Sequence, residues 1–168
     1  MRLRPPLAHK VLPPWADPNQ KPVYLLDWLG FTGTRRGMTK AQLRTIEQWV
    51  KIICPNSVVH GCCWGADMQF HDLCSTLMVK IALRPSNRQD LIPGLGGCVW
   101  SIAPAEEPLV RNRKIVADAQ WLLAAPAEEQ EILRSGTWAT IRYARKKPGM
   151  NVTVVYPSGR YQTTHIQG

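Results

Sequence analysis

The sequence lacks the features that would place it in several common classes of protein. No run of about 18 apolar residues occurs in its 168 residues, so we expect no membrane-spanning helix and no membrane partner. Residues 1–6 lack the apolar core of a signal peptide. The five cysteines are an odd number without an export signal, so we expect reduced thiols in a cytoplasmic protein and no disulfide framework.

Chain length and net charge narrow the number of domains and the classes of partner that we expect. A chain of 168 residues with a hydrophobic fraction of 45% predicts one globular domain with a real core. The formal net charge is +9, which favours anionic partners such as nucleotides, nucleic acid or an acidic protein surface. The same charge is equally compatible with a role in solubility alone, because charge by itself identifies no site.

Strand-like and helix-like patterns alternate along the chain. Apolar or β-branched runs of strand length cover 23–32, 57–60, 79–83, 121–126 and 152–156. Between them, apolar spacing predicts helices over 39–53, around 70–77, over 111–119 and up to about 147. The first helix opens on Thr39 to Gln42, which has the form of a capping box. This order predicts an α/β domain built on a mainly parallel sheet.

Three segments lie outside this pattern. Residues 1–22 carry six prolines and four basic residues, so we expect an extended, basic N-terminal arm. The domain is expected to cover 23–157, and 158–168 to form a C-terminal tail. Within the domain, residues 84–108 are rich in proline and glycine, and an irregular segment of this length is usually functional or mobile.

The strongest local signal is the turn Ser135-Gly136-Thr137, which opens the helical pattern after the apolar run 121–126. A helix start offers unpaired backbone N–H groups and the positive end of the helix dipole, and therefore binds anions. Gly136 lets a phosphate approach the backbone, and the two flanking hydroxyl groups can donate to it. The turn predicts a site for a phosphate-bearing, nucleotide-like ligand.

Three more loops carry glycine and polar residues: Gly33-Thr34-Arg35, the loop from Gly61 to Asp67, and Arg111-Asn112. In an open α/β sheet the carboxyl ends of the strands form one crevice, so we expect these loops to share a site with the Ser-Gly-Thr turn. Asp67 would accept from ribose hydroxyls and Arg111 would bind a phosphate or carboxylate. Each loop also has a plainer interpretation: a turn at Gly33, a helix cap at Asp67 and a surface charge at Arg111.

None of these loops is a Walker A loop or a G-x-G-x-x-G fingerprint, because the glycine spacing is wrong. Trp64 lies in a predicted ligand loop, where stacking on a nucleobase and core packing are equally compatible with the sequence; core packing is favoured for Trp138. The predicted ligand-binding residues are Gly33, Thr34, Arg35, Gly61, Trp64, Gly65, Asp67, Arg111, Asn112, Ser135, Gly136 and Thr137.

Cysteine and histidine cluster between residues 60 and 74. Cys62 and Cys63 are adjacent, which is not the spacing of a structural zinc site. Cys74 falls on the apolar face of a predicted helix, where a free thiol packs as a small hydrophobic group. We therefore expect no metal ion and no other cofactor.

Together, these motifs resemble the SLOG superfamily, named after the Smf/DprA and LOG proteins. The matching pieces are 30–35, 60–61 with 65–67, 111–116 and 135–137, within residues 24–157. The chain looks most similar to the small stand-alone branch of YpsA-like proteins. The resemblance implies a Rossmann-like fold with five strands in the order 3-2-1-4-5 and helices on both faces. It also implies a nucleotide, or a derivative such as ADP-ribose, as ligand.

The resemblance leaves the activity open. Superfamily members include phosphoribohydrolases of nucleoside monophosphates, nucleotide sensors, and DprA-type proteins that bind single-stranded DNA. The hydrolases carry a Gly-Gly-x-Gly-Thr-x-x-Glu motif, and here Thr140 stands at the position of the glutamate. A threonine hydroxyl cannot replace a carboxylate as a base. We therefore expect a sensor or sequestering protein, with Asp67 as the catalytic carboxylate if the protein is an enzyme. Single-stranded nucleic acid and a second copy of the chain remain candidate partners.

Overall fold

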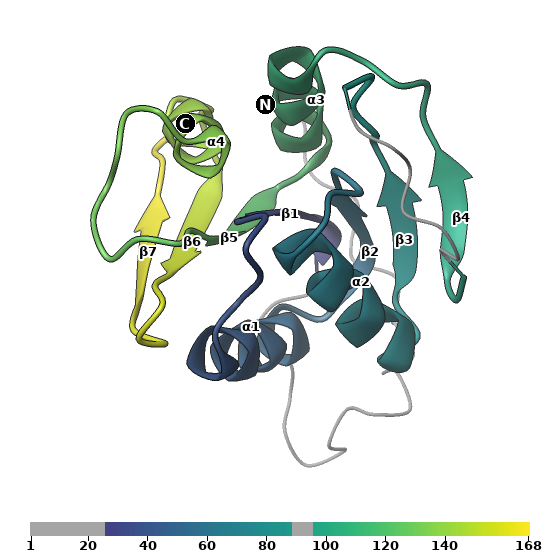
Figure 1. Cartoon of the computed structure of the whole chain (residues 1–168), viewed down its shortest axis with the longest axis horizontal. Helices are drawn as coiled ribbons and strands as arrows, with labels where there is room; N and C mark the ends of the chain where they lie inside the picture. The colour runs from purple at the N-terminus through teal and green to yellow at the C-terminus, as the bar shows by residue number, and fades with distance from the viewer. Residues whose placement is uncertain (1–25, 89–95) are drawn as a thin grey trace.

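One seven-stranded sheet forms the centre of the fold (Figure 1). The computed structural model describes residues 26–88 and 96–168. The strand order is β4-β3-β2-β1-β5-β6-β7, and all neighbours are parallel except the antiparallel pair β6 and β7. The strands are β1 Leu26–Gly33, β2 Pro55–His60, β3 Lys80–Leu83, β4 Val99–Ile102, β5 Trp121–Ala125, β6 Asn151–Val155 and β7 Tyr161–His165.

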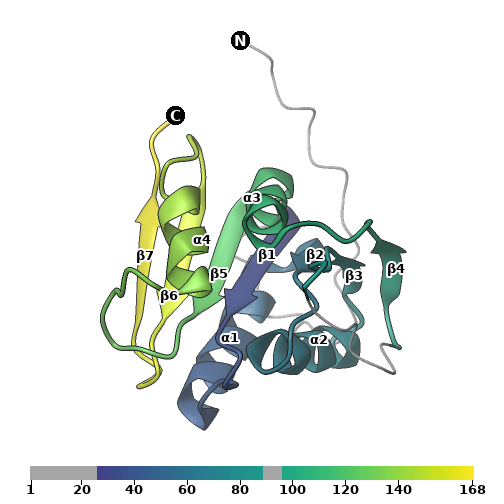
Figure 2. The same ribbon diagram turned by 45° about the horizontal axis from the view of Figure 1, so that its top comes forward.

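Helices cover both faces of the sheet, as the resemblance implies. Those in the described residues are α1 Lys40–Ile53, α2 Ala66–Thr76, α3 Pro108–Asp118 and α4 Gly136–Ala144. Helices α1 and α2 lie on one face, and α3 and α4 lie on the other (Figures 1 and 2). Each pair closes its own apolar core against the sheet. The inner strands are therefore buried on both faces, which explains their nearly continuous apolar runs. No described helix has the length and apolar character needed to span a bilayer.

The expectation of five strands is wrong, because the sheet has seven. The strands expected from the sequence are the inner ones, β3-β2-β1-β5-β6. The two additional strands are the edges: β4 lies within 84–108, which the sequence predicts to be irregular, and β7 lies within the predicted tail 158–168. Both strands are short and largely exposed. An edge strand is not covered like an inner one, so its sequence need not carry a buried apolar run.

The capping box predicted at the start of α1 is confirmed. The Thr39 hydroxyl accepts from the Gln42 N–H at 3.0 Å, and the Gln42 side chain accepts from the Thr39 N–H at 3.1 Å. The Gln42 amide also donates to the carbonyl oxygens of Pro126 and Val155. Because Gln42 is buried, this one side chain both caps α1 and ties it to the carboxyl ends of β5 and β6.

Helix α3 begins at Pro108, three residues before the start predicted at Arg111. Proline favours the first turn of a helix, because the N–H it lacks would have no partner there. Arg111 and Asn112 therefore lie inside the helix and not in a loop. The predicted arm 1–22 and part of the segment 84–108, residues 89–95, lie outside the described residues.

Lys147, which follows α4, caps the C-terminus of α3. Its Nζ donates to the carbonyl oxygens of Val116, Ala117 and Ala119 at 2.7, 3.0 and 2.6 Å. The last carbonyl groups of a helix have no partner within the helix, and a cation there also interacts favourably with the helix dipole. The contact fixes α3 against the segment that leads into β6.

Replacing Lys147 by methionine removes these three donors and keeps most of the apolar stem. We expect Lys147→Met to lower the free energy of unfolding by about 2 kcal/mol, the scale of hydrogen bonds to a charged group. Urea unfolding measures the loss, with Lys146→Met as the control because Lys146 is exposed. Equal stability of the two variants would contradict the capping role.

Candidate functional site

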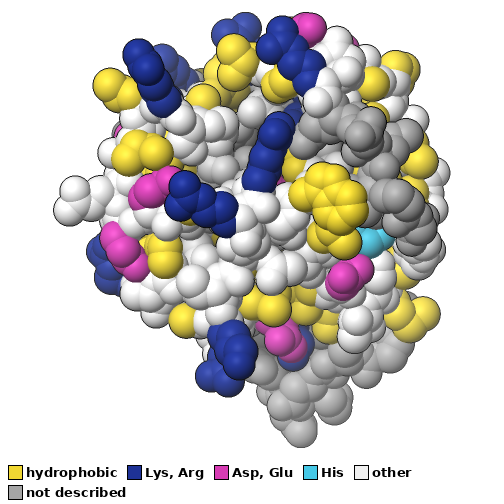
Figure 3. Space-filling view, viewed as in Figure 1, with side chains coloured by type: hydrophobic (Ala, Val, Ile, Leu, Met, Phe, Trp, Pro, Cys, Tyr) yellow, Lys and Arg dark blue, Asp and Glu magenta, His cyan; other side chains and the backbone are white. Residues whose placement is uncertain are grey.

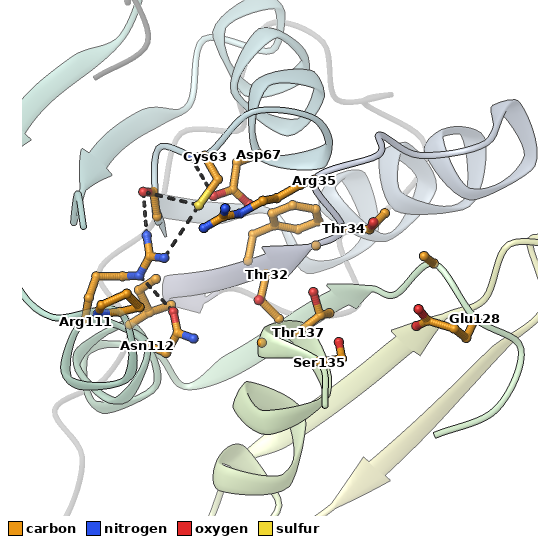
Figure 4. A pocket seen from close by; sticks show the side chains of 17 residues that line it. Thr32, Thr34, Arg35, Cys63, Asp67, Arg111, Asn112, Glu128, Ser135 and Thr137 are labelled. Atoms are coloured by element: carbon orange, nitrogen blue, oxygen red, sulfur yellow. Dashed lines mark hydrogen bonds between the residues drawn. The ribbon is translucent and has the colours of Figure 1, made fainter. Parts of the chain in front are cut away.

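A pocket lies at the carboxyl ends of β1, β2 and β5 (Figure 4). It brings together residues from all four segments that the sequence singles out, as expected for an open parallel sheet. Trp64 and Gly65 do not line the pocket. The predicted residues that line it are Gly33, Thr34, Arg35, Gly61, Asp67, Arg111, Asn112, Ser135, Gly136 and Thr137.

The N-terminus of α4 forms one wall of the pocket. Ser135 is the N-cap residue, and its hydroxyl oxygen accepts from the Trp138 N–H at 3.3 Å. The N–H groups of Gly136 and Thr137 precede any intrahelical acceptor, and none of the described residues accepts from them. A Cβ at Gly136 would meet nothing within 4 Å, and both residues line the pocket, so open space adjoins this turn. Free donors and open space at a helix start are the features of an anion site.

The loop after β1 lies across the pocket from α4 (Figure 4). The Thr34 N–H donates to the carbonyl oxygen of Ala125 at 3.0 Å, and the Thr34 carbonyl accepts from Ala66 at 2.9 Å. The backbone groups of Thr34 therefore hold neighbouring segments together and are engaged within the protein. Arg35 is exposed and reaches over the pocket. Its guanidinium has no hydrogen bond or ion pair within the described part of the chain, so it is available to a ligand.

Gly65 shapes the pocket from behind. Its φ is +84°, and a Cβ there would lie 2.3 Å from the carbonyl oxygen of Arg35. Only glycine allows this approach of the two loops. Trp64 is 53% exposed, so it does not pack in the core, whereas Trp138 is buried as predicted. Stacking of Trp64 on a ligand stays a prediction.

Asp67 is a buried carboxyl group that lines the pocket; its side chain is 4% exposed. Its Oδ2 accepts from the Cys63 N–H at 3.1 Å. Burial raises the pKa of Asp67 to about 6, against the opposing effects of the Cys63 hydrogen bond and the positive charge of Arg111. Such a group changes its protonation close to neutral pH, so it can accept or donate a proton there.

Arg111 also lines the pocket, but its donors are directed into the protein. Nη1 donates to the carbonyl oxygens of Gly61 at 2.5 Å and Arg84 at 3.2 Å. Nη2 contacts the Cys63 sulfur at 3.5 Å, and Nε donates to Asn112 Oδ1 at 2.8 Å. These contacts show that Arg111 fixes the loop after β2. Most of the N–H donors that Arg111 would need for the predicted bidentate contact with a ligand are therefore already engaged within the protein.

The histidines of the cysteine and histidine cluster form a buried pair beside the loop after β2. His60 Nδ1 accepts from the Cys62 N–H at 3.1 Å, so its Nε2 carries the proton and donates to His71 Nδ1 at 3.0 Å. His71 Nε2 in turn donates to the Gly96 carbonyl at 3.2 Å. Burial lowers the pKa of His60 to about 3, which keeps it neutral. In the described residues, no group of three or more potential ligands is placed to hold a metal ion.

Sequence reasoning missed several lining residues, namely Phe31, Thr32, Cys63, Pro108, Ile115, Ala127 and Glu128. Some of them adjoin the predicted motifs: Thr32 precedes Gly33, and Cys63 lies between Gly61 and Asp67. Glu128 has no such signal, because it lies in a charged stretch well before Ser135. The pocket therefore holds two carboxyl groups, Asp67 and Glu128. Thr140 does not line it; its hydroxyl is buried and donates to the Gly136 carbonyl at 2.9 Å.

Comparisons with known proteins support the fold. No protein-family model and no curated protein sequence matches the chain. Among solved structures, the X-ray structure of DNA processing protein A (DprA) from Streptococcus pneumoniae is similar, with a TM-score of 0.56 and 19% sequence identity. The match covers 77% of this chain and 50% of that chain, so this chain spans about half the length of its neighbour. The chain therefore shares a Rossmann-like α/β fold with that structure.

The raised pKa of Asp67 makes stability depend on pH. Its folded-state pKa of about 6 lies above the ordinary 3.8, so the group stabilises the fold at low pH and loses that contribution as the pH rises through 6. At about 1.4 kcal/mol per pKa unit, we expect about 2 kcal/mol to be lost between about pH 4.5 and 7.5, relative to Asp67→Asn. Urea unfolding of both proteins measures this difference, and equal pH dependence of the two would refute the assignment.

Proposed function

We propose that the protein binds a phosphate-bearing nucleotide or nucleotide derivative in this pocket and acts as a sensor or sequesters its ligand. The observation that carries the proposal is the start of α4, where Gly136 and Thr137 line the pocket and none of the described residues accepts from their N–H groups. Arg35 stands across the same space without an internal partner. Phosphate oxygens accept strongly from both kinds of donor.

The remaining groups suit the rest of such a ligand. Asp67 would accept from ribose hydroxyls, as proposed from the sequence. Arg111 would add positive charge beneath the pocket while its hydrogen bonds hold Gly61 in place. We also propose that the protein is cytoplasmic, that it is related to the YpsA-like proteins that its motifs resemble, and that it forms a homodimer.

Asp67 favours a second candidate function, hydrolysis of the N-glycosidic bond of nucleoside monophosphates. A general acid must be protonated near the working pH, and the pKa of this carboxyl is raised to about 6 by burial. The reaction would release a free base, which chromatography detects across a panel of nucleoside monophosphates. If the Asp67→Asn variant still releases the base, Asp67 is not the general acid. If the native protein releases no base from any nucleotide of the panel, the protein does not catalyse this hydrolysis.

Single-stranded nucleic acid is the weaker candidate. The net charge of +9 favours it, and the similar solved structure is of a protein described as a DNA processing protein. On the face in Figure 3, however, Lys and Arg side chains are dispersed among acidic and apolar ones. An extended phosphate backbone would need a continuous basic surface, which the described residues on this face do not form. The pocket, with donors on Arg35, Gly136 and Thr137, fits a small ligand better.

Gly136→Trp tests the placement of the phosphate. The new side chain fills the open space at the first residue of α4 and meets no described atom within 4 Å at its Cβ. We expect the variant to keep its fold, followed by circular dichroism, and to lose at least about tenfold in affinity for its nucleotide because the indole occupies the phosphate position. Isothermal titration with nucleoside 5′-monophosphates and ADP-ribose measures that affinity.

Lys40→Trp is the matched control, because Lys40 is the exposed first residue of α1. It should bind like the native protein. Undiminished affinity in the folded Gly136→Trp variant would contradict a phosphate site at the start of α4.

A further inference from the structure

The loop between β5 and α4 carries Glu128 into the pocket. Residues 126–135 connect the end of β5 to the start of α4, where Ser135 is the N-cap residue. Glu128 is half-buried and lines the pocket, whereas the next three residues are exposed. In Figure 4 it lies on the α4 side of the pocket, and Asp67 lies on the α2 side. The two carboxyl groups therefore flank the ligand space from different walls.

Contacts with α4 and with the turn after β6 hold this loop in place. Arg142 of α4 pairs with Glu131 at 3.0 Å and donates to the carbonyl oxygens of Ile132 and Leu133. On the other side, Glu129 accepts from the Ser158 N–H at 2.7 Å. Both ends of the loop are thus attached to neighbouring elements, and the position of Glu128 is set by the fold.

The Glu128 carboxylate is itself oriented. Its Oε2 accepts from the indole Nε1–H of Trp138 at 3.1 Å, and Trp138 is fully buried in the core beneath α4. Its other oxygen, Oε1, has no hydrogen-bonding partner among the described residues. A fixed carboxylate with one unused acceptor therefore lines the same pocket as the unpaired N–H groups of Gly136 and Thr137.

This arrangement restricts which anion can bind. A carboxylate that lines the same pocket repels a phosphate bound there, and the repulsion is larger in a pocket than in bulk water. The repulsion is offset when the same ligand brings a hydroxyl group that donates to Oε1, because hydrogen bonds to charged acceptors are strong. A phosphate ester without hydroxyl groups meets the repulsion alone.

We propose that Glu128 is a specificity-determining residue that selects sugar phosphates, whose hydroxyl groups donate to its Oε1, over phosphate esters that lack hydroxyl groups. The inference rests on the proposed function, since it requires a phosphate at the start of α4. It extends that function by naming the ligand class, a phosphorylated sugar with free hydroxyl groups, and the residue that recognises it.

Glu128→Gln tests this role, with ribose 5-phosphate and methyl phosphate as probes. The glutamine carbonyl can still accept from the Trp138 indole, but its outward group becomes an N–H donor without charge. We expect the native protein to prefer ribose 5-phosphate by about tenfold or more, on the scale of hydrogen bonds to charged groups. In Glu128→Gln this preference should fall several-fold, while affinity for methyl phosphate stays equal or increases because the repulsion is gone.

Glu47→Gln is the matched control, because it removes the same charge from α1, where Glu47 pairs with Lys51 and lies outside the pocket; it should behave like the native protein. A Glu128→Gln variant that keeps the full preference would overturn the inference, as would equal loss of affinity for both probes. Equal binding of both probes to the native protein would also overturn it while leaving the phosphate site intact. No binding of either probe would overturn the inference together with the phosphate site on which it rests.

Discussion

The buried guanidinium of Arg111 holds together the part of the fold on which the candidate site depends. It lies where α3 crosses the ends of β2 and β3, and it donates to the carbonyl oxygens of Gly61 and Arg84. A buried charge is costly without such acceptors. A Cβ at Gly61 would lie 2.0 Å from Arg111 Nη1, so any other residue there would displace this guanidinium. With these loops fixed, Asp67 is enclosed and α4 faces an open pocket.

The parts of the fold that follow from local chemistry could be predicted from the sequence. The strand 121–125 is apolar throughout because both of its faces are buried, and the Thr39 capping box needs only neighbouring residues. The edge strands could not be predicted in this way. Tyr161–His165 is a strand because it pairs antiparallel with β6. Its mostly polar sequence gives no signal that predicts this pairing.

The location of the pocket could be predicted, because the ends of parallel strands meet at one edge of the sheet. The direction of each side chain could not. Arg111 reaches the pocket from a helix, and its N–H groups donate to backbone carbonyl oxygens of the protein. Trp64 lies outside the pocket. Glu128 enters through a loop that is held by contacts with Arg142 and Ser158, which lie outside the loop. Contacts of this kind leave no spacing pattern.

Backbone amide resonances provide the most direct measurement of a phosphate at the start of α4. In isotope-labelled protein titrated with adenosine 5′-monophosphate, the N–H signals of Gly136 and Thr137 should move furthest and saturate, because both groups would donate to the phosphate. The Trp64 amide, outside the pocket, should move less. A saturating titration that moves other amides and leaves those of Gly136 and Thr137 unchanged would contradict the proposed site.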